Sequence, residues 1–293
     1  LGKAGLGVLQ ENRSVTRTGG VIVNSGMLRS GINNAFASQA MTVRSVGALD
    51  LNGFNNTVSS LTLESGATSG ATVTTGTGTL TLGGNAALNV NGTGATGAVV
   101  SGNIAATATR TFTVNNGAAA DDLTVAAVIS GAGGVTKAGA GTLALYGANT
   151  YTGVTRVNNN GGTLSVNTLA NGGAASSVGA SGSAASNLVL DGNATLQYVG
   201  GTASTNRNFT LTAGRTSSIS VTDAATNLTI GGASTATTGA LTKLGAGTLT
   251  LSGANLHTGL TTVAGGTLTE GASNALATGG VTVTGGATFD IGA

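Results

Sequence analysis

The sequence predicts an all-β protein wound as a solenoid of about a dozen coils. Apolar residues alternate with Thr and Ser at a period of two, and long phrases recur along the chain. The composition agrees, because the 293 residues include 52 Gly and no Pro, with only 3% aromatic and 7% charged residues. A core made of such small residues suits closely stacked layers of strands.

The composition disfavours both helices and disorder. Gly costs about 1 kcal/mol relative to Ala inside a helix, and Thr and Val lose rotamer freedom there. Disordered chains combine high net charge with low hydrophobicity, whereas this chain has a net charge of +2 and 40% hydrophobic residues. The absence of Cys excludes disulfides and thiol-ligated metals. No apolar run reaches the roughly 18 residues of a membrane-spanning helix.

Three segments show the strand pattern most clearly. They are SSLTLES at 59–65, GTLTLSG at 247–253 and GVTVTGG at 280–286. Each alternates apolar residues with Thr or Ser, and Gly or Asn residues lie close to its ends, so each is predicted to be a short strand between turns.

Long internal repeats organise the chain. The phrase VTKAGAGTLALYGANTYTG at 135–153 returns as LTKLGAGTLTLSGANLHTG at 241–259, with 13 of 19 positions identical. A weaker copy begins at residue 1. The repeats therefore cover approximately 1–134, 135–240 and 241–293, and the last of them is truncated.

The regular spacing of short strands and turns would by itself fit a sandwich, a barrel or a solenoid. Sandwich domains would be separated by linkers, whereas no linker interrupts the repeats and their lengths vary without a change in composition. We therefore expect a single continuous β-solenoid over residues 1–293. Each coil should contain about 20 to 25 residues in three parallel strands.

The lysines mark equivalent positions in the repeats. Lys3, Lys137 and Lys243 are the only lysines, and they coincide when the copies are aligned. A buried ammonium needs a partner, and no carboxylate recurs in step with them, so we expect these lysines outside the core or at a turn. We expect Leu143 and Leu249, six residues further along, to be buried.

The repeated phrase resembles the strand-rich repeat of bacterial autotransporter passenger regions, LTKxGxGTLTLSGxNTYTGxTxVxxGTL. Residues 241–268 match this pattern nearly throughout and 135–164 match it closely, while 1–28 keep only its Lys, Gly, Leu and Val skeleton. The resemblance implies a right-handed parallel β-helix carried outside a Gram-negative cell. It also implies a C-terminal outer-membrane barrel, which this sequence does not contain, so the membrane is expected as a partner only through such a barrel. Because the chain starts at Leu1 rather than Met, we expect a mature product or an excised fragment.

The sequence does not predict an enzyme. His257 is the only histidine, and it occupies the repeat position of Tyr151, so we expect a structural role for it. Neither a Gly-x-Ser-x-Gly elbow nor a Gly-Asp-Ser-Gly nucleophile occurs. We predict no catalytic residue, no cofactor and no metal site.

The acidic residues give no strong site either. Asp121 and Asp122 are adjacent, and neighbours along a strand point to opposite faces, so a turn is favoured over a calcium site. Asp50 and Asp290 share a repeat position with Gln197, which indicates a surface or turn position that does not require a carboxylate.

Five cations crowd the first fifty residues: Lys3, Arg13, Arg17, Arg29 and Arg44. A polyanion or phospholipid site is one interpretation, and a solvated edge of the coils is the preferred one. No stacking aromatic residues accompany them, so a nucleic-acid partner is not expected.

We therefore expect a non-enzymatic extracellular solenoid that acts as a stalk, an adhesin or a fibre component with a hydroxyl-rich face. We expect end-to-end self-association of the chain, because the outer coils of a β-solenoid leave unpaired backbone N–H and C=O groups. One alternative function is a dedicated filament subunit that assembles head to tail. A less favoured alternative is a glycan-active β-helix enzyme. The candidate ligand is a host or matrix glycan or protein.

Overall fold

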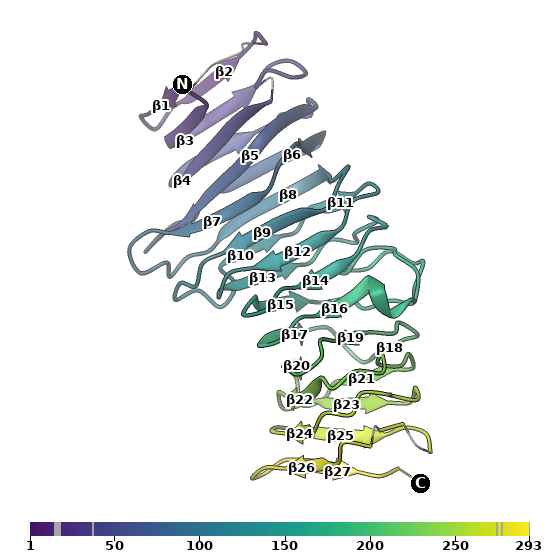
Figure 1. Ribbon diagram of the computed structural model, residues 1–293. Helices are drawn as coiled ribbons and strands as arrows, with labels where there is room; N and C mark the ends of the chain where they lie inside the picture. Colours follow the sequence, from purple (N-terminus) through teal and green to yellow (C-terminus); the bar gives the residue numbers. More distant parts are fainter. Residues whose placement is uncertain (15–18, 37, 274, 277, 293) are drawn as a thin grey trace. The chain divides into compact units, whose positions relative to one another are not determined.

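The computed structural model confirms the predicted fold class. The chain is all-β with 1% helix, and it forms a parallel β-solenoid of about 12 turns (Figure 1). Among the described residues, no helix is long and apolar enough to cross a membrane. The structure describes residues 1–14, 19–36, 38–273, 275–276 and 278–292.

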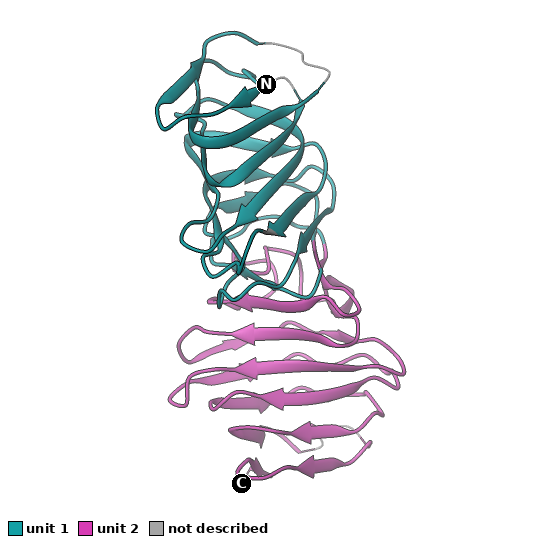
Figure 2. Ribbon diagram, turned by 90° about the vertical axis from the view of Figure 1, so that its left-hand side faces the viewer, with its two compact units in different colours: residues 1–135, 139–153 teal, residues 136–138, 154–293 magenta. Residues whose placement is uncertain are grey.

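The chain divides into two compact units (Figure 2). The first comprises residues 1–135 and 139–153, and the second comprises residues 136–138 and 154–293. The expectation of one continuous solenoid over the whole chain stays a prediction.

The longest strands of the first unit are β3 to β6, with 10 to 12 residues each, and the strands after residue 105 have 3 to 5 residues. These strands are β1 Gly2–Lys3, β2 Val8–Glu11, β3 Val21–Ser30, β4 Gln39–Asp50, β5 Asn56–Ser65, β6 Thr72–Leu82, β7 Ala86–Val90, β8 Ala98–Ala105, β9 Arg110–Val114, β10 Leu123–Val125, β11 Val128–Ser130 and β13 Thr142–Leu145.

The second unit contains strands of two to six residues and one short 3-10 helix. These elements are the last three residues of β12 Val135–Ala138, then β14 Thr155–Val157, β15 Gly162–Val166, η1 Ala185–Asn187, β16 Leu188–Leu190, β17 Ala194–Tyr198, β18 Ala203–Thr205, β19 Thr210–Leu211, β20 Thr216–Val221, β21 Asn227–Ile230, β22 Ala240–Leu244, β23 Thr248–Leu251, β24 Thr261–Val263, β25 Thr267–Glu270, β26 Val281–Val283 and β27 Thr288–Asp290.

Equivalent side chains of successive coils stack into columns inside the first unit. Parallel pairing brings residues 20 to 26 positions apart side by side, and alternation sends every second side chain inward. Every member of the resulting column is buried. The column is Lys3, Val23, Val43, Leu63, Leu88 and Val114.

The second unit repeats this arrangement. One column contains Leu164, Leu196, Ile219, Lys243 and Val263. The separate ladder β18–β21–β23–β25–β27 contributes Leu228, Leu249 and Leu268 to the core. Leu249 is fully buried, and so is Leu143 in the first unit, as predicted.

The later coils contain two strands each, so the prediction of three strands per coil is wrong there. β22 and β23 form one coil, and β24 and β25, which pair with them, form the next. The third side, residues 252–260, is irregular. Side-chain hydrogen bonds hold it: the Asn255 amide oxygen accepts the backbone N–H of Ser234 at 2.8 Å, and Asn149 does the same for Ile129 at 2.7 Å in the first unit.

The lysines lie inside the protein, which corrects the expectation that they lie outside or at a turn. Lys137 and Lys243 are fully buried, and Lys3 is 6% exposed. Their ammonium groups donate to backbone carbonyl oxygens rather than to carboxylates that recur with the repeat. The predicted equivalence of the three positions holds, because all three side chains are buried and bonded in the same way.

Candidate functional surface

An outward sheet face of the second unit is the best candidate for a binding surface. It belongs to the ladder β18–β21–β23–β25–β27. Because Leu249 and Leu268 point into the core, the residues on either side of them point outward. We call the six outward threonines of this ladder the threonine face: Thr229, Thr248, Thr250, Thr267, Thr269 and Thr288.

The strand register turns these threonines into a regular array. Thr248, Thr267 and Thr288 pair in one row. Thr229, Thr250 and Thr269 form the row beside it. Adjacent strands lie about 4.8 Å apart, and alternate residues along a strand lie roughly 6.6 to 6.8 Å apart. Methyl and hydroxyl groups therefore repeat in two dimensions.

The threonine face is nearly free of charge. Between Asp223 and Asp290 the sequence contains only two charged residues, Lys243 and Glu270, and Lys243 is buried. Thr250 donates its hydroxyl to the Asn227 amide oxygen at 3.0 Å, at one edge of the array. Such a face can offer hydrogen bonds and methyl contacts to an uncharged partner, and it lacks the cations that would select a polyanion.

His257 occupies an interior position, as Tyr151 does in the other copy, and both side chains are fully buried. Its Nδ1 lies 2.8 Å from the Ser234 hydroxyl, and its Nε2 lies 3.1 Å from the Thr261 hydroxyl. Ser234 Oγ already accepts the backbone N–H groups of Leu256 and His257. The network therefore favours the neutral tautomer with the proton on Nε2. Burial lowers the pKa of His257.

The adjacent aspartates lie in a bend before β10, in line with the predicted turn. Asp122 is buried, and its carboxylate accepts the backbone N–H groups of Gly117 at 2.7 Å and Thr142 at 2.8 Å. Asp121 accepts the hydroxyl of Tyr146 at 2.8 Å. Both carboxylates therefore have a structural role within the first unit.

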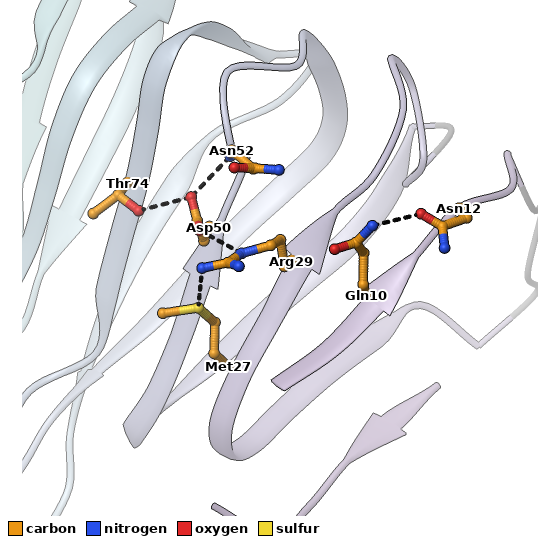
Figure 3. Close-up of polar contacts among 7 residues, drawn as sticks. All are labelled: Gln10, Asn12, Met27, Arg29, Asp50, Asn52 and Thr74. Atoms are coloured by element: carbon orange, nitrogen blue, oxygen red, sulfur yellow. Dashed lines mark hydrogen bonds and ion pairs between the residues drawn. The ribbon is translucent and has the colours of Figure 1, made fainter. Parts of the chain in front are cut away.

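Asp50 pairs across coils rather than lining a site (Figure 3). Arg29 Nε donates to Asp50 Oδ2 at 2.9 Å, and Asp50 Oδ1 accepts the backbone N–H of Asn52 at 2.8 Å. Thr74 donates its hydroxyl to the same carboxylate. Asp290 accepts the backbone N–H of Gly292 at 3.0 Å. Gln197 holds the equivalent position on β17 and pairs with Ser220.

The five N-terminal cations do not form one patch. Lys3 is buried, while Arg29 and Arg44 each pair with a carboxylate of the following coil, Asp50 and Glu64. Arg13 is exposed, and Arg17 lies outside the described residues. Within the described part of the chain, no group of three or more His, Cys, Asp or Glu side chains is placed to hold a metal ion.

Sequence reasoning missed Arg207, which is 2% exposed. Its guanidinium donates to the backbone oxygens of Ala170 at 2.9 Å, Gly179 at 2.8 Å and Ser181 at 2.9 Å. All three acceptors belong to one long loop between β15 and η1. The period-two pattern contained a signal, because Arg207 shares the inward phase of Phe209, which is also buried.

Comparison with known proteins gives two matches. Residues 135–166 and 241–269 match the model of the passenger-associated-transport-repeat family. The chain is also 56% identical over 71 residues to the Adhesin BmaC autotransporter of Brucella suis biovar 1 (strain 1330), over 24% of this chain and 2% of that protein. No solved structure matches the chain. The resemblance to autotransporter passenger regions is confirmed by both matches.

Proposed function

We propose that this autotransporter passenger segment is a non-enzymatic β-solenoid of the outer surface of a Gram-negative bacterium, with a structural and adhesive role. The relative that supports the role carries the word adhesin in its name, and the matched repeats belong to passengers. The observation that carries the proposal is the threonine face, a regular array of uncharged side chains on a parallel ladder.

The arrangement of carboxylates supports a non-enzymatic role. Hydrolysis of a glycosidic bond uses two carboxylates on either side of that bond. Near the threonine face the two acidic residues are Glu270 and Asp290. Glu270 pairs in register with the inward Leu251, whereas Asp290 pairs with the outward Thr269. The register therefore places the two residues on opposite faces of the ladder, which is not the arrangement of a carboxylate pair.

Attachment of coated beads tests the adhesive role. Beads carrying residues 1–293 are passed over immobilised neutral polysaccharides and matrix proteins. We expect beads to attach to at least one coating. Thr250→Lys and Thr267→Lys together should reduce the number of attached beads about tenfold or more, because they place on the face two charges that are costly to remove from water.

A matched variant controls for added charge. Thr42→Lys and Thr62→Lys change two register-paired outward threonines of the first unit, and we expect this variant to attach as the wild type does. Equal loss in both variants, or no attachment to any coating, would refute the threonine face as the adhesive surface. Circular dichroism confirms that each variant is folded before the assay.

A further inference from the structure

The three repeat lysines bind backbone carbonyls in the same way. Lys243 Nζ donates to Leu244 O at 2.7 Å, Gly245 O at 2.9 Å and Gly265 O at 3.1 Å. In each copy the oxygens come from two sources. The turn directly after the lysine supplies some, and the next coil supplies another.

The other two copies reproduce this set. Lys3 Nζ donates to Ala4 O at 3.0 Å, Gly5 O at 2.6 Å and Ser25 O at 3.1 Å. Lys137 Nζ donates to Ala138 O at 2.9 Å and Gly161 O at 2.6 Å. The register is the same as well. Lys243 pairs with Val263 and Lys3 with Val23, and in both cases the acceptor on the next coil lies two residues beyond the partner.

The turn is shaped to point its carbonyls inward. The glycine two residues after each lysine has a positive φ, +81° at Gly5, +79° at Gly139 and +79° at Gly245. L-residues rarely adopt this conformation. A Cβ at Gly245 would also lie 2.2 Å from Val221 O. The Lys-x-Gly sequence therefore specifies the direction of the carbonyl oxygens as well as the position of the lysine.

These oxygens, rather than a counterion, stabilise the charge of the ammonium. Neither Lys3 nor Lys243 forms an ion pair with any residue that the structure describes. Burial of an unpaired ammonium is strongly unfavourable unless charge-assisted hydrogen bonds replace its water. Three oxygens match the three N–H donors of a primary ammonium one for one.

We propose that the turn after each repeat lysine is a backbone-built binding site for a primary alkylammonium ion, a site that the chain fills with its own lysine side chain. The site belongs to the coil pair, because one of its oxygens comes from the neighbouring coil. It should therefore retain affinity for a free alkylammonium when the covalent tether is removed.

Removal of the tether tests this inference. Lys243→Ala deletes three carbons and the ammonium group, which n-propylammonium matches in length and charge. The full chain with this substitution is refolded in n-propylammonium chloride, and its denaturant midpoint is followed by circular dichroism. We expect the lowered midpoint of the variant to rise saturably with the ion. At ten times the dissociation constant, the folding equilibrium constant should increase about elevenfold.

Three controls separate the site from general effects. Tetramethylammonium has the charge without N–H donors, 1-propanol has the length without the charge, and sodium chloride matches ionic strength, so none should reproduce the rise. Ile219→Ala opens an apolar cavity at the register partner of Lys243 in the same column, and n-propylammonium should not rescue it. The wild type, whose site is filled, should respond no more than it does to sodium chloride.

The outcomes decide the matter in each direction. Saturable rescue of Lys243→Ala alone supports the site. Equal rescue of Ile219→Ala, or no rescue of Lys243→Ala, overturns it. If Lys243→Ala does not fold by itself, the recovered folded fraction in n-propylammonium, compared with sodium chloride, replaces the midpoint as the readout. Recovery in the first salt alone supports the site, and failure in both overturns it.

Discussion

Lys243 and Arg207 are cations inside the protein that take backbone oxygens as their partners. The nearly charge-free interior of a solenoid has few carboxylates to offer, but its turns carry many carbonyls that are not used between coils. A long cationic side chain can satisfy several of them at once. For each such residue, several charge-assisted hydrogen bonds therefore offset the free-energy cost of removing the charge from water.

The titration of Lys243 gives a prediction for alkaline pH. Burial lowers the pKa of Lys243 to about 8, whereas an unfolded lysine has a pKa of about 10.4. Between these values the unfolded chain binds more protons, so the free energy of unfolding should rise with pH. Urea unfolding at a series of pH values from about 7.5 to 10 measures this rise, and Lys243→Met should flatten it. Parallel curves for the two proteins would contradict the prediction.

A second prediction concerns the Ser234–His257 pair. In the other copy Ile129 and Tyr151 occupy these positions, so the two copies use two matched pairs. His257→Tyr should destabilise the fold by about 1 to 3 kcal/mol, because the buried Ser234 hydroxyl loses its acceptor. Adding Ser234→Ile, which completes the pair of the other copy, should restore part of that loss.

A double-mutant cycle in urea measures the coupling, and additive effects would show that the two side chains act independently. The same proteins test the acid response of His257. Its pKa is lowered by burial, so stability should fall as the pH drops below about 6.5. His257→Tyr should remove that part of the fall.

The sequence could show that the three lysines are equivalent but could not supply their partners. Repeat alignment correctly made Lys3, Lys137 and Lys243 equivalent. Lys243 also shares the period-two phase of Leu241, which is buried, a signal that the expectation of an outside position left out of account. The prediction of an outside position was wrong because it counted only carboxylates as partners. Backbone carbonyls are present at every residue, so their direction becomes visible only with the dihedral angles of the turn.

At the scale of elements, strands were predictable and long loops were not. The segments 59–65, 247–253 and 280–286 contain or overlap β5, β23 and β26, because alternation is a local signal. The loop between β15 and η1 lengthens its coil, so that Leu164 and Leu196 pair across 32 residues. Several of its backbone oxygens are bonded by Arg207, which comes after the loop in the chain, and no local pattern contains that information.

Arg207 gives the prediction at this scale. Arg207→Met should release the loop between residues 170 and 182, because several backbone oxygens lose their donor together. Elastase, which cuts after small residues, should then nick this loop at least several-fold faster, as read by mass spectrometry. Arg215→Met is the matched control, since Arg215 is exposed and bonds the side chain of Asn159. Equal cleavage rates for the two variants would refute the role of Arg207.

At the scale of the whole molecule, head-to-tail association stays a prediction. Val8 on β2 is 56% exposed and Val283 on β26 is 45% exposed, and outer strands offer unpaired N–H and C=O groups to further strands. We expect the apparent molar mass of residues 1–293, measured by light scattering, to increase with concentration. Val8→Lys or Val283→Lys should reduce this increase. Thr42→Lys, on a coil flanked on both sides, should leave it unchanged. Scattering of a monomer at every concentration would exclude the filament alternative.

The parallel register within each unit has a mechanical consequence. Hydrogen bonds between successive coils run along the stacking direction. Tension along that direction therefore breaks them one after another rather than all at once. Detaching one coil of 20 to 26 residues releases about 65 to 95 Å of extended chain. We therefore expect a unit under load to yield in steps. Such a unit converts a sudden pull into a graded lengthening.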